Sequence, residues 1–154
     1  MTLFKKSLLF FVLIGTLTST HAQKTPAKKI KLPKLTTSLA NVSDSLVTIN
    51  VEQAKSIIGN PLKVMDDKMK QYKILYYDFL YKRKAVKEDE ATGKISATTT
   101  IAEDHFTTSP LPALWTNIIK DQLKSGEELY FFDIIVQNDK GAAMYAPNLK
   151  ILIQ

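Results

Sequence analysis

Glu103-Asp104-His105 is the only cluster of acidic residues and histidine in the sequence, and such a run could bind a divalent cation or carry acid–base chemistry. Carboxylates and imidazole are metal ligands, and a histidine oriented by a carboxylate is the usual base for a serine or threonine nucleophile. However, three adjacent residues of an extended chain point to alternating sides, and the other histidine, His21, lies in a segment expected to be removed. We therefore predict no metal site and no cofactor, and interpret the run as polar residues ahead of a helix.

Asp78 and Asp133 are the other carboxylates of catalytic interest, because each lies in the middle of an apolar run. A carboxylate pair can hydrolyse a glycosidic bond, but the separation of these two cannot be read from the sequence. Buried carboxylates more often pair with a backbone donor or a lysine. The sequence also lacks Gly-x-Ser-x-Gly, a glycine-rich phosphate loop and His-Glu-x-x-His. We predict that the protein is not an enzyme, and we assign no catalytic residue.

Two short charged runs flank a predicted hairpin turn and supply the candidate partner-binding residues. These residues are Lys82, Arg83 and Lys84 on one side and Glu88, Asp89 and Glu90 on the other. The ordinary interpretation is cross-strand pairing of opposite charges, worth about 0.2–1 kcal/mol per pair. The functional interpretation is a protruding charged finger that docks a partner.

Several aromatic side chains could instead form a stacking platform for sugars or bases. They are Tyr72, Tyr76, Tyr77, Tyr81, Tyr130 and Phe131. Aromatic residues on strands with apolar side chains on both faces usually belong to the core, and we favour that interpretation.

An amphipathic helix followed at once by an apolar strand is the strongest structural pattern. Ser109 is the predicted N-cap, with Pro110 at the first helical position and the helix over about residues 110–124. The predicted buried stripe is Leu111, Leu114, Trp115, Ile118, Ile119 and Leu123, and the polar side is Thr116, Asn117, Lys120, Asp121 and Lys124. Gly126 supplies the left-handed residue that ends the helix. Leu129–Val136 is predicted to be a central strand.

A long hairpin is predicted from Tyr72–Val86 and Lys94–Ala102, which are both rich in β-prone residues. Its first strand has apolar residues on both faces, which favours a strand covered on both sides. Met144–Ile153 is predicted to be the last strand, with Pro147 at an edge position or a bulge.

A short helix completes the pattern, because Asn50 followed by Gln53 is a capping-box arrangement ahead of a few apolar residues. Consecutive antiparallel strands with one substantial helix predict a β-sandwich, or a sheet with the helix packed on it.

Residues 1–22 have the pattern of a cleaved signal peptide. Two lysines precede an apolar run over residues 8–17, and Thr20-His21-Ala22 is a small-x-small cleavage site. The apolar run is about half the roughly 20 residues needed to span a bilayer. We therefore predict cleavage after Ala22, no stable membrane insertion afterwards, and a periplasmic or secreted mature chain.

The net charge of +6 is concentrated near the amino terminus. Seven of the 21 basic residues precede Leu35, which leaves 14 against 15 acidic residues and a net charge of −1 for the remainder. We interpret residues 23–38 as a solvated basic linker before one domain over residues 39–154, and predict no nucleic-acid partner. The chain has no cysteine, which excludes disulfides and zinc–cysteine sites.

The segment that ends at Val136, L-K-S-G-E-E-L-Y-F-F-D-I-I-V, resembles the segment near the end of the GldM family of Bacteroidetes, the periplasmic shaft of the gliding-motility and type IX secretion machinery. The similarity covers about 80 residues at the carboxy end and includes Tyr72–Phe79, Phe106-Thr107 and Asp139-Lys140-Gly141. The family's Gly-Pro-Asp-Gly turn is not reproduced, and Phe132 replaces its glutamate.

The resemblance implies an immunoglobulin-like β-sandwich used for protein–protein contact in the cell envelope, with no catalytic residue to transfer. We therefore predict a mainly β, antiparallel sandwich with the amphipathic helix packed on it. The predicted function is an exported, non-catalytic module that binds or assembles with envelope proteins or with a second copy of itself. The alternative is a periplasmic ligand- or glycan-binding domain that uses exposed aromatic residues.

Overall fold

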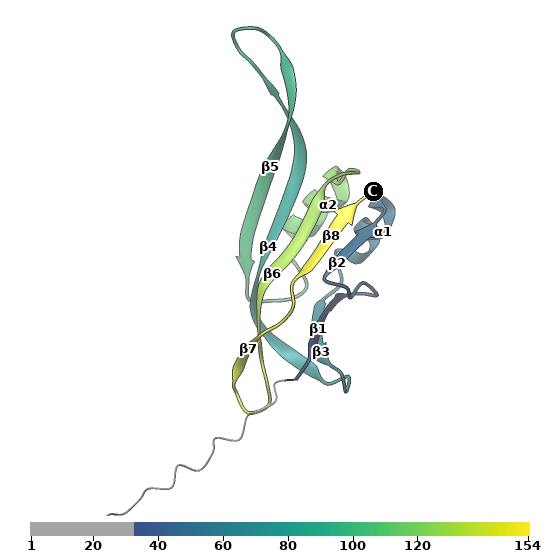
Figure 1. The fold of residues 1–154 in the computed structure, drawn as a ribbon, viewed down its shortest axis with the longest axis vertical. Coiled ribbons are helices and arrows are strands. Elements are labelled where there is room, and N and C mark those ends of the chain that lie inside the picture. Colours follow the sequence, from purple (N-terminus) through teal and green to yellow (C-terminus); the bar gives the residue numbers. More distant parts are fainter. Residues whose placement is uncertain (1–32) are drawn as a thin grey trace, which may run out of the picture. The chain divides into compact units, whose positions relative to one another are not determined.

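The computed structural model describes residues 33–154 (Figure 1). The predicted signal peptide and most of the predicted linker lie outside the described residues. The described elements are β1 (Leu35–Leu39), β2 (Leu46–Ile49), α1 (Val51–Ile57), β3 (Leu62–Asp66), β4 (Gln71–Glu88), β5 (Ile95–Phe106), α2 (Ala113–Gln122), β6 (Glu128–Gln137), β7 (Ala143–Tyr145) and β8 (Leu149–Ile153). Residues 35–38, which the sequence analysis placed in the linker, belong to β1.

The described strands form one sheet with the order β1-β3-β4-β6-β8-β2, while β5 pairs with β4 and β7 pairs with β6. The sheet curls, and the Thr37 hydroxyl of β1 donates a hydrogen bond to the Pro147 carbonyl just before β8. Every strand pair is antiparallel except β2–β8, which is parallel. The predicted mainly β fold is confirmed and fits a β-sandwich-like arrangement, whereas purely antiparallel pairing was wrong for β2.

Local patterns explain most of the elements. The Asn50 side chain accepts a hydrogen bond from the backbone N–H of Gln53 at 2.8 Å, so the predicted cap of α1 is confirmed. The predicted hairpin is present as β4 and β5, and the predicted central strand is β6, which pairs with β4, β7 and β8. The last strand is divided into β7 and β8 by a break that contains Pro147.

Helix α2 begins later than the sequence predicted. Its N-cap is Pro112, without a side-chain cap, and the Ser109 hydroxyl instead accepts a hydrogen bond from the Leu62 N–H at 2.6 Å. Pro112 explains the difference, because a residue before proline is pushed away from helical backbone angles and Leu111 therefore cannot start the helix. The helix also ends at Gln122, so Gly126, at φ 81°, belongs to the following turn and not to the helix end.

The buried face of α2 differs from the predicted stripe at two positions. Ile119 is fully buried and Trp115 packs edge-on against Phe79, with ring centroids 5.3 Å apart. Leu114 is 70% exposed, because it precedes the buried Ile119 by five residues and therefore points about 140° away from it around the helix axis. Thr116, predicted on the polar side, is buried, and its hydroxyl donates to the Ala113 carbonyl within the helix.

Candidate functional site

The outer half of the β4–β5 hairpin, residues 83–101, extends past the rest of the sheet, and we call it the arm (Figure 1). The pairing of β4 with β6 ends at Lys82 opposite Glu128. The pairing of β4 with β5 continues for six further residue pairs, up to Glu88 opposite Ile95. The arm is therefore a two-stranded ribbon whose two faces are largely uncovered.

Asp89 builds the turn at the arm tip. Its carboxylate accepts hydrogen bonds from the backbone N–H of Ala91 at 3.0 Å and from the N–H and hydroxyl of Thr92 at 2.9 and 3.0 Å. These bonds, led by the one from the Thr92 hydroxyl, hold the pKa of Asp89 below its ordinary value. Gly93 completes the turn at φ 65°, a left-handed conformation that favours glycine.

The candidate partner-binding charges do not form one cluster. The register places Lys82, Arg83 and Lys84 opposite uncharged residues, namely Ile101, Thr100 and Thr99. Glu88 lies opposite Ile95 at the far end of the arm, while Asp89 and Glu90 belong to the tip turn. The predicted cross-strand pairing of these charges was therefore wrong, because the basic run lies at the arm base and the acidic run at its tip.

Exposed apolar side chains are the feature of the arm that the sequence analysis missed. Val86 is 73% exposed, Ile95 66% and Ile101 60%. Val86 lies directly opposite Ala97 in the hairpin. Side chains two and four positions apart on a strand point the same way, so Ile95 and Ile101 lie on the same face as Ala97 and Val86. The alternation in I-S-A-T-T-T-I, without any charge, was the available signal.

Both edges of the arm lack a strand partner within residues 33–154, and the edge formed by β5 is the one without charges. Among the described strands β5 pairs only with β4, so the backbone groups along its other edge are unpaired. Exposed edges usually carry charges, prolines or bulges that prevent association. No charged residue and no proline occurs from Ile95 to Ala102, so this part of the edge is unprotected.

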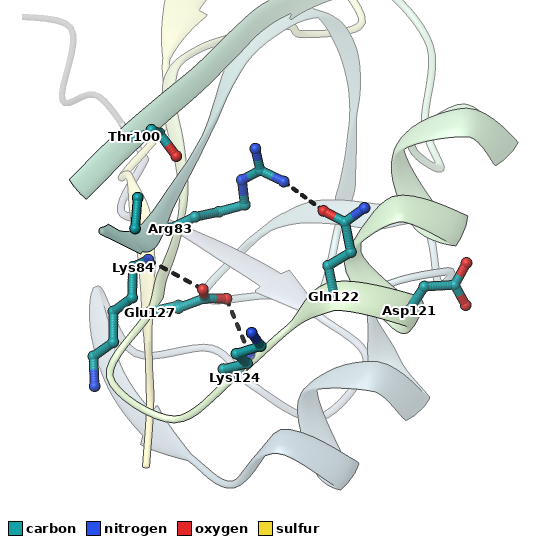
Figure 2. Close-up of a pocket in the computed structure, with 8 residues that line it drawn as sticks. Arg83, Lys84, Thr100, Asp121, Gln122, Lys124 and Glu127 are labelled. Atoms are coloured by element: carbon teal, nitrogen blue, oxygen red, sulfur yellow. Dashed lines mark hydrogen bonds between the residues drawn. The ribbon is translucent and has the colours of Figure 1, made fainter. Parts of the chain in front are cut away.

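Glu127 fastens the arm base to the turn after α2 (Figure 2). This carboxylate is only 4% exposed and accepts hydrogen bonds from the Tyr81 hydroxyl at 2.6 Å, the Lys84 N–H at 3.1 Å and the Lys124 N–H at 3.0 Å. Burial and the hydrogen bond to Glu127 raise the pKa of Tyr81. No local sequence pattern singles out Glu127, because its burial depends on two distant segments meeting.

An open pocket of about 450 Å³ lies beside Glu127 at the arm base (Figure 2). Its lining residues are Arg83, Lys84, Ala85, Thr100, Asp121, Gln122, Lys124 and Glu127. The Arg83 guanidinium donates a hydrogen bond to the Gln122 side-chain oxygen. Glu127 and Arg83 therefore bind groups of the protein itself and hold the arm at a defined position on the body.

The residues of the Glu103-Asp104-His105 run point to opposite sides of β5, as predicted. The Asp104 carboxylate accepts a hydrogen bond from the Trp115 ring N–H at 3.3 Å on the side of α2. The His105 ring lies on the other side, where its Nδ1 is 2.6 Å from the Asp78 carboxylate and its ring packs 4.9 Å from that of Tyr76. Residues 33–154 contain no group of three potential ligands placed to hold a metal ion.

Asp133, the second carboxylate considered for catalysis, is exposed and has φ 46°. It follows Phe132, which lies opposite Asp78 in the β4–β6 register. The carboxylate of Asp78 contacts the His105 ring. Neither Asp78 nor Asp133 lines the pocket at the arm base.

Most of the candidate aromatic platform belongs to the core. Tyr72, Tyr77, Tyr81 and Phe131 are buried. Burial raises the pKa of Tyr77 to about 12, and its hydroxyl donates to the Thr108 carbonyl at 3.1 Å. Tyr76 and Tyr130 are half-buried, and the ring of Tyr130 stacks on that of Phe132 at 5.0 Å. The interpretation as core is confirmed for the four buried residues.

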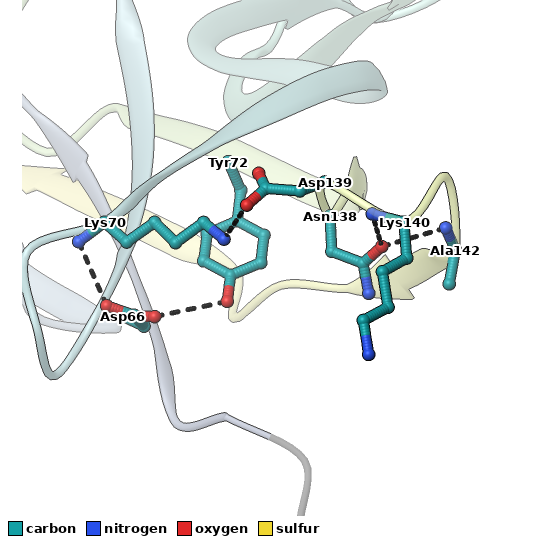
Figure 3. A network of polar contacts seen from close by, with 7 residues as sticks. All are labelled: Asp66, Lys70, Tyr72, Asn138, Asp139, Lys140 and Ala142. Atoms are coloured by element: carbon teal, nitrogen blue, oxygen red, sulfur yellow. Dashed lines mark hydrogen bonds and ion pairs between the residues drawn. The ribbon is translucent and has the colours of Figure 1, made fainter.

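The opposite end of β4 carries a polar network that joins two turns (Figure 3). Asp66 accepts hydrogen bonds from the N–H groups of Lys70 and Lys68 at 3.0 and 2.9 Å, and these bonds lower its pKa, the one from Lys70 most. The Lys70 ammonium forms an ion pair with Asp139, which raises the pKa of Lys70. The polar groups of this network therefore bind one another and hold the two turns in place.

None of the helices within residues 33–154 combines the length and the hydrophobicity that crossing a bilayer requires.

In comparisons with known proteins, no family model, no curated protein and no solved structure matches this chain.

Proposed function

We propose that this chain is an exported, non-catalytic module that binds a protein partner in the bacterial cell envelope, and that the arm is the binding element. Export rests on the signal-peptide pattern of residues 1–22. Binding through the arm is supported by the exposed apolar face of Val86, Ile95 and Ile101 beside an unpaired strand edge. That juxtaposition is the observation on which the proposal depends.

A two-stranded hairpin without a packed face has marginal stability in water. The arm nevertheless exposes three large apolar side chains and an unpaired edge, and exposed apolar patches and free edges are typical of surfaces that bind other proteins. A partner strand added to this edge would pair its backbone groups and cover its apolar side chains at the same time.

The anchoring of the arm base supports the same role. Three hydrogen bonds to the buried Glu127 carboxylate and the contact between Arg83 and Gln122 hold the ribbon on the body. A positioned ribbon loses less conformational freedom on binding than a mobile loop, and this increases affinity for a given contact area.

Site-specific photo-crosslinking in cells that produce the full chain tests the proposal. A photoreactive residue replaces Val86 on the arm or, as a matched control, Leu114 on α2, which is similarly exposed at 70% against 73%. We expect a discrete crosslinked product from position 86 that is absent from position 114. The partner identified in that product should bind the purified chain, and Val86→Lys should weaken the binding.

Equal products from both positions, or none from position 86 in a folded chain, would contradict the assignment of the arm. Folding is checked by the fluorescence of Trp115, the only tryptophan, which packs against Phe79 and Phe106 in the body.

A further inference from the structure

We infer that the partner of the arm is a second copy of this chain, and that two arms pair edge to edge through β5. The two strands run antiparallel, with Thr98 of one copy opposite Thr98 of the other. This inference rests on the proposed function, because it names the occupant of the same surface. The interface is isologous, since each copy contributes the same residues.

The direction of the backbone groups of β5 allows this pairing. The Asp89 N–H, just after β4, donates to the carbonyl of Lys94, just before β5, at 3.0 Å, so the backbone of Lys94 points toward the β4 side of the hairpin. In an antiparallel pair such residues alternate with residues that point the other way. The outward-pointing residues are Ile95, Ala97, Thr99 and Ile101. Their N–H and C=O groups are therefore available to a second strand.

The sequence of this edge complements itself. A two-fold axis at Thr98 places Ile95 opposite Ile101, Ser96 opposite Thr100 and Ala97 opposite Thr99. Each outward-pointing residue meets another outward-pointing residue, so the pairs can exchange both backbone hydrogen bonds. The exposed isoleucines then cover one another on one face, while hydroxyl side chains meet on the other.

Neighbouring registers lack this match. A two-fold axis at Ala97 would place Ile95 opposite Thr99, and an axis at Thr99 would place Ile95 opposite Glu103. An axis between two residues is excluded, because it would bring side chains from opposite faces into register. Thr98 is therefore the centre that pairs both isoleucines with apolar residues.

The distribution of charge along the arm favours the antiparallel orientation. In this orientation the acidic end of one arm, where Glu88 lies opposite Ile95, is level with the basic end of the second arm, where Lys82 lies opposite Ile101. A parallel arrangement would align acid with acid and base with base. The edge of β4 beyond the end of β6 is the poorer candidate, because it contains Lys84, Lys87 and Glu88 and charges protect an edge.

Single cysteines test the register directly, since the full chain contains none. In the inferred dimer Thr98 of one copy forms a non-hydrogen-bonded pair with Thr98 of the other copy. Their Cα atoms are about 4.5 Å apart, a separation that a disulfide between cysteines can bridge. The matched controls Ser96→Cys and Thr100→Cys lie on the same exposed face, but each is displaced from its own copy by about 13 Å along the strands.

We expect Thr98→Cys to form a disulfide-linked dimer under mild oxidation, while Ser96→Cys and Thr100→Cys alone do not. A mixture of the Ser96→Cys and Thr100→Cys chains should form the mixed dimer. Equal crosslinking of all three variants, or no dimer from a folded Thr98→Cys chain, would overturn the inferred register. Circular dichroism and Trp115 fluorescence establish that each variant is folded.

Sedimentation velocity without cysteines provides a second test. Ile95→Lys and Ile101→Glu should each raise the dissociation constant of the dimer at least about tenfold, because each places a charge opposite an isoleucine at two symmetric positions. The chain carrying both substitutions should regain association, since opposite charges then face one another. A monomeric chain at all concentrations, or no rescue in the double variant, would overturn the inference.

The results also separate this inference from the proposed function. A crosslink from position 86 to a different protein, together with no disulfide dimer from Thr98→Cys, would overturn self-pairing and leave the arm as a binding element. No crosslink from the arm to any protein would contradict both.

Discussion

The buried carboxylate of Glu127 joins β4 to the segment between α2 and β6. Its partners, the hydroxyl of Tyr81 and the backbone of Lys84 and Lys124, come from segments about 40 residues apart in sequence. A buried acceptor that loses a donor retains its desolvation penalty, so each member of this group depends on the others.

We predict that Glu127→Gln destabilises the protein by about 1–3 kcal/mol, because the amide retains the size of the side chain but turns one acceptor into a donor facing other donors. Urea denaturation followed by Trp115 fluorescence measures the change. Tyr81→Phe should cost less, and a double-mutant cycle should show coupling between the two positions. Strictly additive effects would mean that the hydrogen bond between Tyr81 and Glu127 contributes nothing.

Asp89 controls the pH dependence of the arm tip. The pKa of its carboxyl is lower in the folded chain than in the unfolded chain, so its contribution to stability is present above the unfolded value of about 3.8. The contribution is lost as the pH falls through the lower folded pKa, because a protonated carboxyl is a weaker acceptor for Ala91 and Thr92.

We expect hydrogen exchange of the Ala91 and Thr92 amides, corrected for intrinsic rates, to accelerate as the pH falls below the folded pKa of Asp89. The variant Asp89→Asn retains an acceptor oxygen without a titrating group, and its protection should not change over the same range. A carboxyl carbon of Asp89 that titrates at or above 3.8 by NMR would refute this account.

Helix α2 shows how an element is positioned by packing rather than by its own cap. Its N-cap Pro112 offers no side-chain hydrogen bond, and the helix is held by Ile119, Thr116 and the edge-on contact of Trp115 with Phe79 and Phe106. A helix of ten residues has little stability alone, so these contacts supply most of it.

Two truncations on the same helix separate packing from helix propensity. Ile119→Ala should cost about 2–5 kcal/mol, because it leaves a cavity at a fully buried position. Leu114→Ala should change stability by about 0.5 kcal/mol or less, because Leu114 is exposed. Thermal and urea unfolding give both values, and a comparable loss in the two variants would contradict the observed orientation of α2.

At the scale of the whole molecule, closure of the sheet depends on β8. This strand pairs with β6 on one side and with β2 on the other, and its Leu149, Ile151 and Ile153 are buried. Its removal would leave β2 without a strand partner and one end of the core uncovered.

We therefore expect a chain that ends at Asn148 to lose cooperative unfolding, measured by circular dichroism, and to bind dyes that detect exposed apolar surface. A chain that lacks only Gln154 should unfold cooperatively, because it loses a single backbone hydrogen bond, to Ile49. A cooperative transition in the shorter chain would show that β8 is dispensable for the core.

Local features of the fold were predictable where the physical cause lies within a few residues. The strand β6 follows from its apolar composition, the hairpin from two β-prone runs around a polar turn, and the cap of α1 from Asn50 and Gln53. The start of α2 was misplaced although Pro112 was a local signal against helical angles at Leu111, and the contact of the Ser109 hydroxyl with Leu62, 47 residues away, is the part that no local pattern reports.

The mainly β character of the chain and its amphipathic helix could be predicted from the sequence, since side-chain periodicity and turn residues act over short distances. The three-dimensional fold sets three further features: β2 joins β8 in parallel, Glu127 is buried, and the outer edge of β5 has no strand partner within the described domain. These three facts depend on which distant segments meet. An identical strand sequence can lie in the centre of a sheet or at its edge, according to what the rest of the chain places beside it.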